Sequence, residues 1–296
     1  MATDTNIFIP CICGSGIALE KCCLVNIASK LEIEANIIPP KPKTGVSNNR
    51  CLLASTCDCS LVKSREHYLS ASVLKQIDQV IAVQGVPWIQ PHESNTFRVS
   101  SLTSKVFCKR HNEALSSLDT SAAKFFSAIK RFSKSSYDGR DRIEIFNGRD
   151  IERWMLKTLY GLIKSKSLQL KQGARLSIHI DERCLDLLFG RVPFEYGRGF
   201  FMRTSYSKHI QVFNHISVSP VLNNTGRTLQ GLEFNLLGFD FLLSTCPINV
   251  EGGVFRPGFI VFTSNTGTKV IRLYWPDTSK EEILIFSSSE SEQNIA

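Results

Sequence analysis

The sequence lacks any apolar run long enough to cross a bilayer, which takes about 20 residues in a helix. Its first residues also lack the basic stretch and following apolar stretch of a secretory signal. These absences predict a cytoplasmic chain that does not span a membrane. Acidic residues are comparatively few: 27 Asp and Glu stand against 35 Lys and Arg, which gives a formal net charge of +8. An excess of this sign favours a polyanionic partner, most simply nucleic acid. An anionic membrane surface would also attract it, but no amphipathic anchor is evident.

The cysteines are numerous and unevenly distributed. Ten cysteines in 296 residues would suggest disulfides in a secreted protein, but eight of them lie before residue 109, in clusters with metal-like spacing. In a reducing cytoplasm such clusters favour zinc over disulfides. The hydrophobic content of 43% is sufficient for a real core, and the length allows two domains with a small appendage.

The first cluster has the pattern C-x-C-G-S-G-x5-C-C. Four thiolates at this spacing can close a tetrahedral zinc site, and the two glycines allow the backbone to turn back sharply. A disulfide or four unrelated thiols are the alternatives, although the two adjacent cysteines do not pair easily with each other. A site of four protein thiolates leaves no open position for substrate, which indicates a structural role. The predicted ligands are Cys11, Cys13, Cys22 and Cys23.

This run resembles the SEC-C motif, a small zinc-binding segment found at the end of the SecA translocation ATPase and appended to many other proteins. The resemblance covers about residues 8–25 and includes all four cysteines and the Gly-Ser-Gly. It implies a zinc-held accessory module, with a protein as its possible partner.

A second cluster begins at Cys51 and ends at His111. Cys108 and His111 are three residues apart at the start of a predicted helix, so they lie on one face and can share one ion. Cys51 and Cys59 would supply the remaining two ligands, and Cys57 competes with either of them. A segment this small buries little apolar surface alone, so the cluster favours a second structural zinc that would hold it together.

The pair Glu66-His67 lies between the two halves of this cluster, and Asn112 follows His111 directly. This order resembles the ββα-metal finger of the HNH endonuclease family, over about residues 50–120. The resemblance implies hydrolysis of DNA, with Glu66 and Asn112 holding a catalytic ion and His67 activating water as the general base. Oxygen ligands suit Mg²⁺ or Mn²⁺. The combination of modules is similar to that of defence or restriction effectors.

One part of the family pattern is missing from this sequence. The middle asparagine, which helps to orient the catalytic histidine in relatives, is absent from residues 99–105. Ser101 or Thr103 would have to replace it. The absence favours an alternative function, a non-catalytic zinc adaptor that binds nucleic acid or protein, whereas the intact Glu66-His67 pair favours the enzyme.

Positive charge gathers beside the predicted site and in the segment after it. Lys105, Lys109 and Arg110 are expected to contact phosphates. Residues 121–174, which include Arg153 and Lys157, form a basic helical region. Its charges either extend the phosphate-binding surface or belong to the solvated faces of two amphipathic helices.

The expected fold class is α+β. Hydrophobic periodicity predicts helices over 120–134 and 150–164. From about residue 175 the pattern alternates, which predicts strands at 176–180, 210–213, 232–236, 259–262 and 270–274. The expected parts are the zinc module at 1–25, a proline-containing linker at 26–49, the HNH-like finger at 50–120, the basic helical region at 121–174, a strand-rich domain with a largely antiparallel sheet at 175–286, and a disordered tail at 287–296.

Overall fold

The protein is an α+β structure built from four helices and two large sheets, within the part of the chain that the computed structural model describes. The described residues are 17–18, 21, 37, 39, 41–67, 69–85, 89, 93–133, 142–165, 182–203, 215–223, 228–248, 253–264, 267–275 and 282–287. The predicted zinc motif, the strands predicted at 176–180 and 210–213, and nearly all of the predicted tail lie outside these ranges.

The helices are α2 (Ala71–Ile77), α3 (Lys109–Phe132), α4 (Gly148–Lys164) and α5 (Glu182–Leu188). The helices predicted at 120–134 and 150–164 are confirmed as the second half of α3 and most of α4. Helix α3 already begins at Lys109, because no glycine or proline interrupts its 24 residues and its apolar residues keep one helical face. The predicted finger helix and the first basic helix are therefore one continuous element.

The larger sheet has seven strands in the order β10-β6-β9-β8-β7-β2-β3. All neighbours are antiparallel except β2 and β7, which are parallel, so the expected largely antiparallel sheet is confirmed. The strands are β2 (Val80–Gln84), β3 (Ser94–Arg98), β6 (Gly199–Arg203), β7 (His215–Leu222), β8 (Leu229–Leu236), β9 (Phe239–Ser244) and β10 (Val254–Phe255).

The smaller sheet has four strands in the order β13-β11-β12-β5. Only β11 and β12 are antiparallel; the outer strands β13 and β5 run parallel to their neighbours. The strands are β5 (Arg142–Asn147), β11 (Pro257–Ser264), β12 (Gly267–Tyr274) and β13 (Glu282–Ser287). The strands predicted at 232–236, 259–262 and 270–274 are confirmed as parts of β8, β11 and β12.

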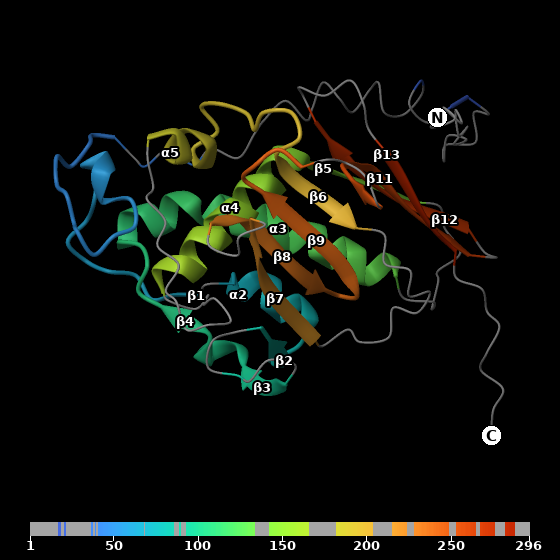
Figure 1. The fold of residues 1–296 in the computed structure, drawn as a ribbon, viewed down its shortest axis with the longest axis horizontal. Coiled ribbons are helices and arrows are strands. Elements are labelled where there is room, and N and C mark those ends of the chain that lie inside the picture. The colour runs from blue at the N-terminus through green and yellow to red at the C-terminus, as the bar shows by residue number, and fades with distance from the viewer. Residues whose placement is uncertain are drawn as a thin grey trace.

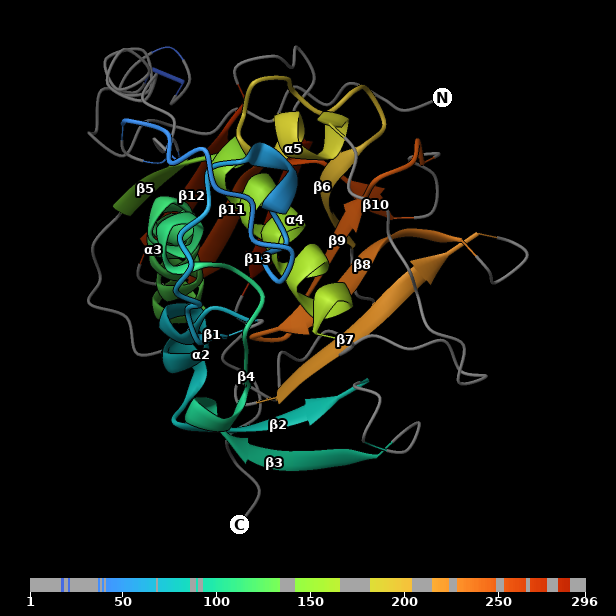
Figure 2. The ribbon, with the colours of Figure 1, turned by 90° about the vertical axis from the view of Figure 1, so that its left-hand side faces the viewer.

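The long helices α3 and α4 pack side by side against the sheets (Figures 1 and 2). Phe125 of α3 contacts Phe146 of β5 and Phe241 of β9, with ring centroids 5.6 and 6.4 Å apart. Its neighbour Phe126 contacts Trp154 of α4 at 5.3 Å. The aromatic face of α3 therefore joins both sheets and α4 in one core.

A small antiparallel pair, β1 (Glu66–His67) and β4 (Thr103–Ser104), lies ahead of α3. The chain between its strands contains α2, β2 and β3. Because β2 pairs with β7, this insertion connects the β1–β4 hairpin to the seven-stranded sheet. The hairpin, its helix and the C-terminal strands thus share one scaffold.

Helix α4 buries charged residues that the sequence analysis placed in a basic helical region. The side chain of Arg153 is 4% exposed and pairs with Asp150, and that of Lys157 is 4% exposed and pairs with Asp119. The surface interpretation is wrong for these two cations, because each has a carboxylate partner that makes burial tolerable.

The Lys157–Asp119 pair belongs to a polar network that ties α3 to α4 next to β1. Lys157 Nζ lies 2.6 Å from Asp119 Oδ2. Ser70 Oγ donates a hydrogen bond to the other oxygen of Asp119 and accepts one of 2.7 Å from Trp154 Nε1. The network satisfies four polar groups where the hairpin, α2 and both long helices meet.

Replacing Asp119 by alanine should lower the free energy of unfolding by about 3–5 kcal/mol, because it removes the carboxylate from a buried ammonium. Adding Lys157→Met should restore part of the loss. The matched control is Asp186→Ala, which removes the carboxylate of the exposed Asp186–Arg191 pair and should cost less than about 1 kcal/mol. Chemical denaturation measures the free energy of unfolding of the wild type, the two single variants and the double variant. Equal losses in the two single variants would show that the Asp119 network contributes no special stability.

Candidate metal centre and the hairpin beside it

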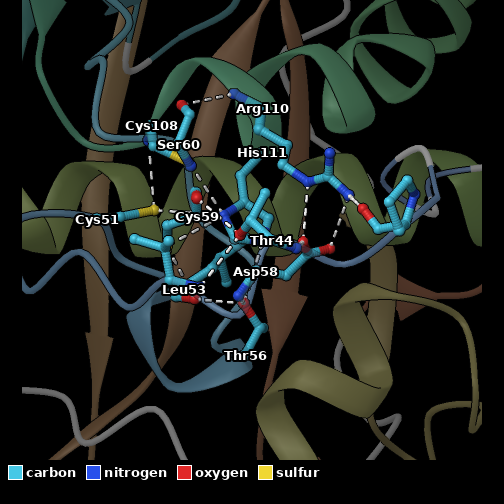
Figure 3. A network of polar contacts seen from close by, with 12 residues as sticks. Thr44, Cys51, Leu53, Thr56, Asp58, Cys59, Ser60, Cys108, Arg110 and His111 are labelled. Carbon is cyan, nitrogen blue, oxygen red and sulfur yellow. Dashed lines mark hydrogen bonds and ion pairs between the residues drawn. The ribbon is translucent and has the colours of Figure 1, made fainter.

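Four buried side chains converge where the loop before β1 meets the start of α3 (Figure 3). The ligand atoms of this group lie within 4.8 Å of one another, and no member is more than 2% exposed. The members are Cys51, Cys59, Cys108 and His111. The structure therefore brings together the four residues predicted to bind the second zinc.

The distances fit a tetrahedral zinc ion. Nδ1 of His111 lies 3.2 Å from Cys108 Sγ, 3.5 Å from Cys51 Sγ and 3.7 Å from Cys59 Sγ. Zinc bonds of about 2.3 Å to sulfur and 2.0–2.1 Å to nitrogen, at tetrahedral angles, would place nitrogen and sulfur about 3.5–3.6 Å apart. The four side chains could hold the ion with little rearrangement.

The hydrogen bonds around His111 determine which nitrogen carries its proton. The Thr56 hydroxyl donates to the Leu53 carbonyl at 2.7 Å, so its oxygen is left to accept a bond from His111 Nε2, 3.2 Å away. The proton then resides on Nε2, and the Nδ1 lone pair faces the three sulfurs. An outer partner that fixes the tautomer in this way is typical of a metal-bound histidine.

The thiols are arranged to carry charge once a cation is bound. Burial raises the pKa of Cys51 to about 12 and also raises the pKa of Cys59. Burial acts in the same direction on Cys108, but backbone N–H groups, among them that of Ser60 at 3.4 Å, outweigh it and lower its pKa. The Cys108 N–H in turn donates to Cys51 Sγ at 3.3 Å. Zinc deprotonates thiols that it binds, and these N–H donors would stabilise the thiolates.

The competition between Cys57 and Cys59 is settled by the loop conformation. A 3-10 helix at Ala54–Thr56 ends at Cys57, whose φ of 50° is left-handed. Cys57 is exposed, whereas Cys59 is 1% exposed and lies in the cluster. The loop turns Cys59 inward and leaves Cys57 at the surface.

Asp58 holds the loop that contains Cys57 and Cys59 against the start of α3. Its carboxylate accepts a 2.8 Å hydrogen bond from the Thr44 N–H and lies 2.9 Å from Arg110 Nε. Burial opposes ionisation, but these partners outweigh it and the pKa of Asp58 is lowered. Arg110 Nη2 also donates to the Pro42 carbonyl at 2.9 Å. Arg110, predicted to contact phosphate, thus has partners within the protein.

The strand that carries Glu66 and His67 runs directly past the start of α3. Lys63 forms a β-bridge with Cys108, and His67 lies opposite Thr103 in the β1–β4 register. Asn112 Nδ2 donates to Ser64 Oγ at 2.9 Å, whereas its Oδ1 is buried without a hydrogen-bond partner in the described structure. The predicted Asn112 is therefore held against the chain at Ser64, two residues before Glu66. Of the two candidates to replace the missing asparagine, Thr103 faces His67 across the pair, whereas Ser101 bonds the Arg98 carbonyl.

His67 points its free nitrogen inward. Its Nε2 exposes less than 1 Å² and has no hydrogen-bond partner in the described structure. Burial lowers the pKa of His67 and outweighs the opposing effects of the Val99 backbone and Asp119, so the ring is neutral near pH 7. A cavity of about 10 Å³, close to the space of a single water, lies beside it. Its other lining residues are Ser70, Val106, Phe107, Lys157, Thr158 and Gly161.

Both lysines predicted to contact phosphate lie at the surface. Lys105 is exposed, and Lys109 has a 62% exposed side chain whose ammonium lies 3.8 Å from the Glu113 carboxylate. Both are available to an external anion. The side chain of Glu66 lies outside the described part of the structure, and so do the predicted ligands of the first zinc, which are Cys11, Cys13, Cys22 and Cys23.

No protein-family model, curated protein or solved structure matches this chain. No helix in the described part of the chain is long and apolar enough to cross a membrane. A functional assignment therefore depends on the geometry of the metal centre and of the adjacent hairpin.

Proposed function

We propose that the chain is a metal-dependent endonuclease of the HNH type that hydrolyses phosphodiester bonds in DNA. The observation that carries the proposal is the β1–β4 hairpin leading into α3. Beside a cluster that fits zinc, Asn112 at the start of α3 donates a hydrogen bond to Ser64, two residues before Glu66 of β1. Strand, strand and helix come in the order that the ββα resemblance requires.

Glu66 and Asn112 would hold a Mg²⁺ or Mn²⁺ ion. The buried Oδ1 of Asn112 has no hydrogen-bond partner within the described residues, which supports its use as an oxygen ligand. When bound, the ion would stabilise negative charge on the phosphate and on the leaving oxygen.

His67 would act as the general base. Its neutral ring can accept a proton at Nε2, and the adjacent cavity has room for one water. Thr103 lies opposite His67 and would take the place of the missing asparagine in orienting it. The proton would pass from the attacking water to Nε2 as the new bond to phosphorus forms. The bond from phosphorus to the leaving oxygen would break in the same displacement, and that oxygen would take a proton from solvent.

The enclosure of His67 favours a second candidate function. Because Nε2 exposes less than 1 Å², a phosphodiester cannot reach it without movement of the residues around the cavity. A non-catalytic zinc-dependent module that binds nucleic acid or protein needs no such access.

Nicking of supercoiled plasmid by the zinc-loaded protein separates the two functions. We expect nicking that requires Mg²⁺ or Mn²⁺, and Asn112→Ala should require a higher ion concentration for the same rate. Asn95→Ala, on the exposed strand β3, is the matched control and should behave like the wild type. Absence of nicking with either ion in the folded, zinc-loaded wild type would contradict the nuclease and favour the binding module.

A further inference from the structure

A second hollow, with none of the lining residues of the His67 cavity, opens beside the metal centre. It has a volume of about 470 Å³ and is formed by the loop before Cys51 and the segment after Cys59. Its lining residues in the described part of the chain are Ser47, Asn48, Asn49, Arg50, Leu61 and Lys63. The His67 cavity, by comparison, is only about 10 Å³.

The metal ligands fix both walls of this hollow. Arg50 directly precedes Cys51, whose N–H donates to the Asn48 carbonyl at 2.7 Å. Asn48 Nδ2 crosses to the opposite wall and donates to the Ser60 carbonyl at 3.0 Å, next to Cys59. Zinc would therefore hold the hollow in shape as well as the hairpin.

Cys108 fixes the second wall from the helix side. It forms the β-bridge with Lys63, and the N–H of the next residue, Lys109, donates to the Val62 carbonyl at 2.8 Å. Two of the four predicted zinc ligands, Cys51 and Cys108, thus adjoin lining residues directly, and Cys59 precedes Ser60, whose carbonyl accepts from Asn48.

The hollow carries uncompensated positive charge. Arg50 is exposed and Lys63 is half-buried, and neither forms an ion pair within the described structure. No acidic side chain lines the hollow among the described residues. Leu61 and Val62 at its edge are 81% and 62% exposed, so they place apolar surface beside the two cations. Together these features indicate an anionic ligand that also offers apolar surface.

Among such ligands, the lining favours duplex nucleic acid over a single strand. Proteins that bind single strands generally stack the bases on aromatic rings, and the described lining contains none. Arginine, lysine and amide side chains are the usual contacts to a duplex backbone, and aliphatic side chains can pack on its sugars or base steps.

We infer that this hollow binds the phosphodiester backbone of duplex DNA, with Arg50 and Lys63 contacting phosphates and Leu61 packing on the sugars. The inference rests on the proposed function only for the choice of DNA as the polyanion. It adds a docking surface on the zinc-held loop that is built from residues other than His67, Glu66 and Asn112.

Fluorescence anisotropy with a labelled 20-base-pair duplex, without Mg²⁺ and over a range of salt concentrations, tests the inference on the full chain. Replacing both Arg50 and Lys63 by alanine should weaken binding at least about tenfold and reduce the slope of log K against log salt by about 2. Zinc content must equal that of the wild type, which shows that the loop is intact.

The matched control removes two cations elsewhere, with Lys124→Ala and Arg142→Ala. Lys124 lies about 24 Å along α3 from Cys108, on the basic helical region that is the rival surface. This control should keep the wild-type affinity apart from a small effect of net charge. An unchanged slope in the Arg50, Lys63 variant, a larger loss in the control, or no duplex binding by the wild type would each overturn the inference.

Nicking by the same proteins keeps this inference separate from the proposed function. Binding through the hollow without any nicking would leave the docking surface standing and remove the nuclease. If the Arg50, Lys63 variant nicks plasmid as fast as the wild type, the nuclease would stand and the docking surface would be removed.

Discussion

Cys59→Ser is expected to remove the zinc ion from the second cluster, whereas Cys57→Ser is expected to leave it bound. The two cysteines are two residues apart, but only Cys59 is buried within 3.7 Å of His111 Nδ1. A structural zinc contributes directly to folding, so Cys59→Ser should also expose the start of α3 and the β1–β4 hairpin.

Metal analysis of the purified variants measures this directly. Zinc should fall by one ion per chain in Cys59→Ser relative to wild type, whatever the cysteines before residue 25 bind, and should not change in Cys57→Ser. Hydrogen exchange should rise near residues 103–112 only in Cys59→Ser. If Cys57→Ser loses zinc and Cys59→Ser keeps it, then Cys57 and not Cys59 is the zinc ligand, and the loop conformation described above is contradicted.

His67→Ala is expected to slow plasmid nicking by about 10²–10⁴-fold, the usual contribution of a general base. Zinc content should not change, and the free energy of unfolding should fall by only about 1 kcal/mol, because the ring loses its hydrogen bond to the Val99 backbone whereas Nε2 makes none within the described structure. His215→Ala is the matched control: His215 is a half-buried histidine on β7 whose pKa is also lowered by burial.

Nicking rates of the two histidine variants and the wild type are compared at saturating Mg²⁺. Only His67→Ala should lose activity. Equal nicking by His67→Ala and wild type would remove His67 from the reaction, and an equal loss in His215→Ala would indicate a structural effect of either substitution.

Spacing along the chain was enough to predict which side chains meet in the cluster, apart from the choice between Cys57 and Cys59, but not which residues support them. The i, i+3 relation of Cys108 and His111 places them on one helical face, and the structure confirms that they meet Cys51 and Cys59. The roles of Thr56 and Asp58 had no such signal. Each depends on how the loop closes onto α3, a contact between residues more than 50 positions apart.

In the fold, too, the sequence predicted local elements but not contacts between residues far apart in the chain. Periodicity predicted α4 and the strands at β8, β11 and β12, because each has a regular apolar pattern. It could not show that Lys157 is buried, since its partner Asp119 lies 38 residues earlier. Nor could it place β2 beside β7, a parallel pairing between residues about 130 positions apart, which only the three-dimensional structure provides.

The cluster of Cys51, Cys59, Cys108 and His111 adjoins the β1–β4 hairpin, the start of α3 and the hollow lined by Arg50 and Lys63. Identifying the atoms that bind zinc there is therefore the most direct test of the proposed metal centre. Zinc-edge X-ray absorption should be recorded on a variant in which Cys11, Cys13, Cys22 and Cys23 are serine. We expect three sulfur neighbours at about 2.3 Å and one nitrogen neighbour at about 2.0 Å. A protein that binds no zinc, or a shell dominated by oxygen, would contradict the proposed centre.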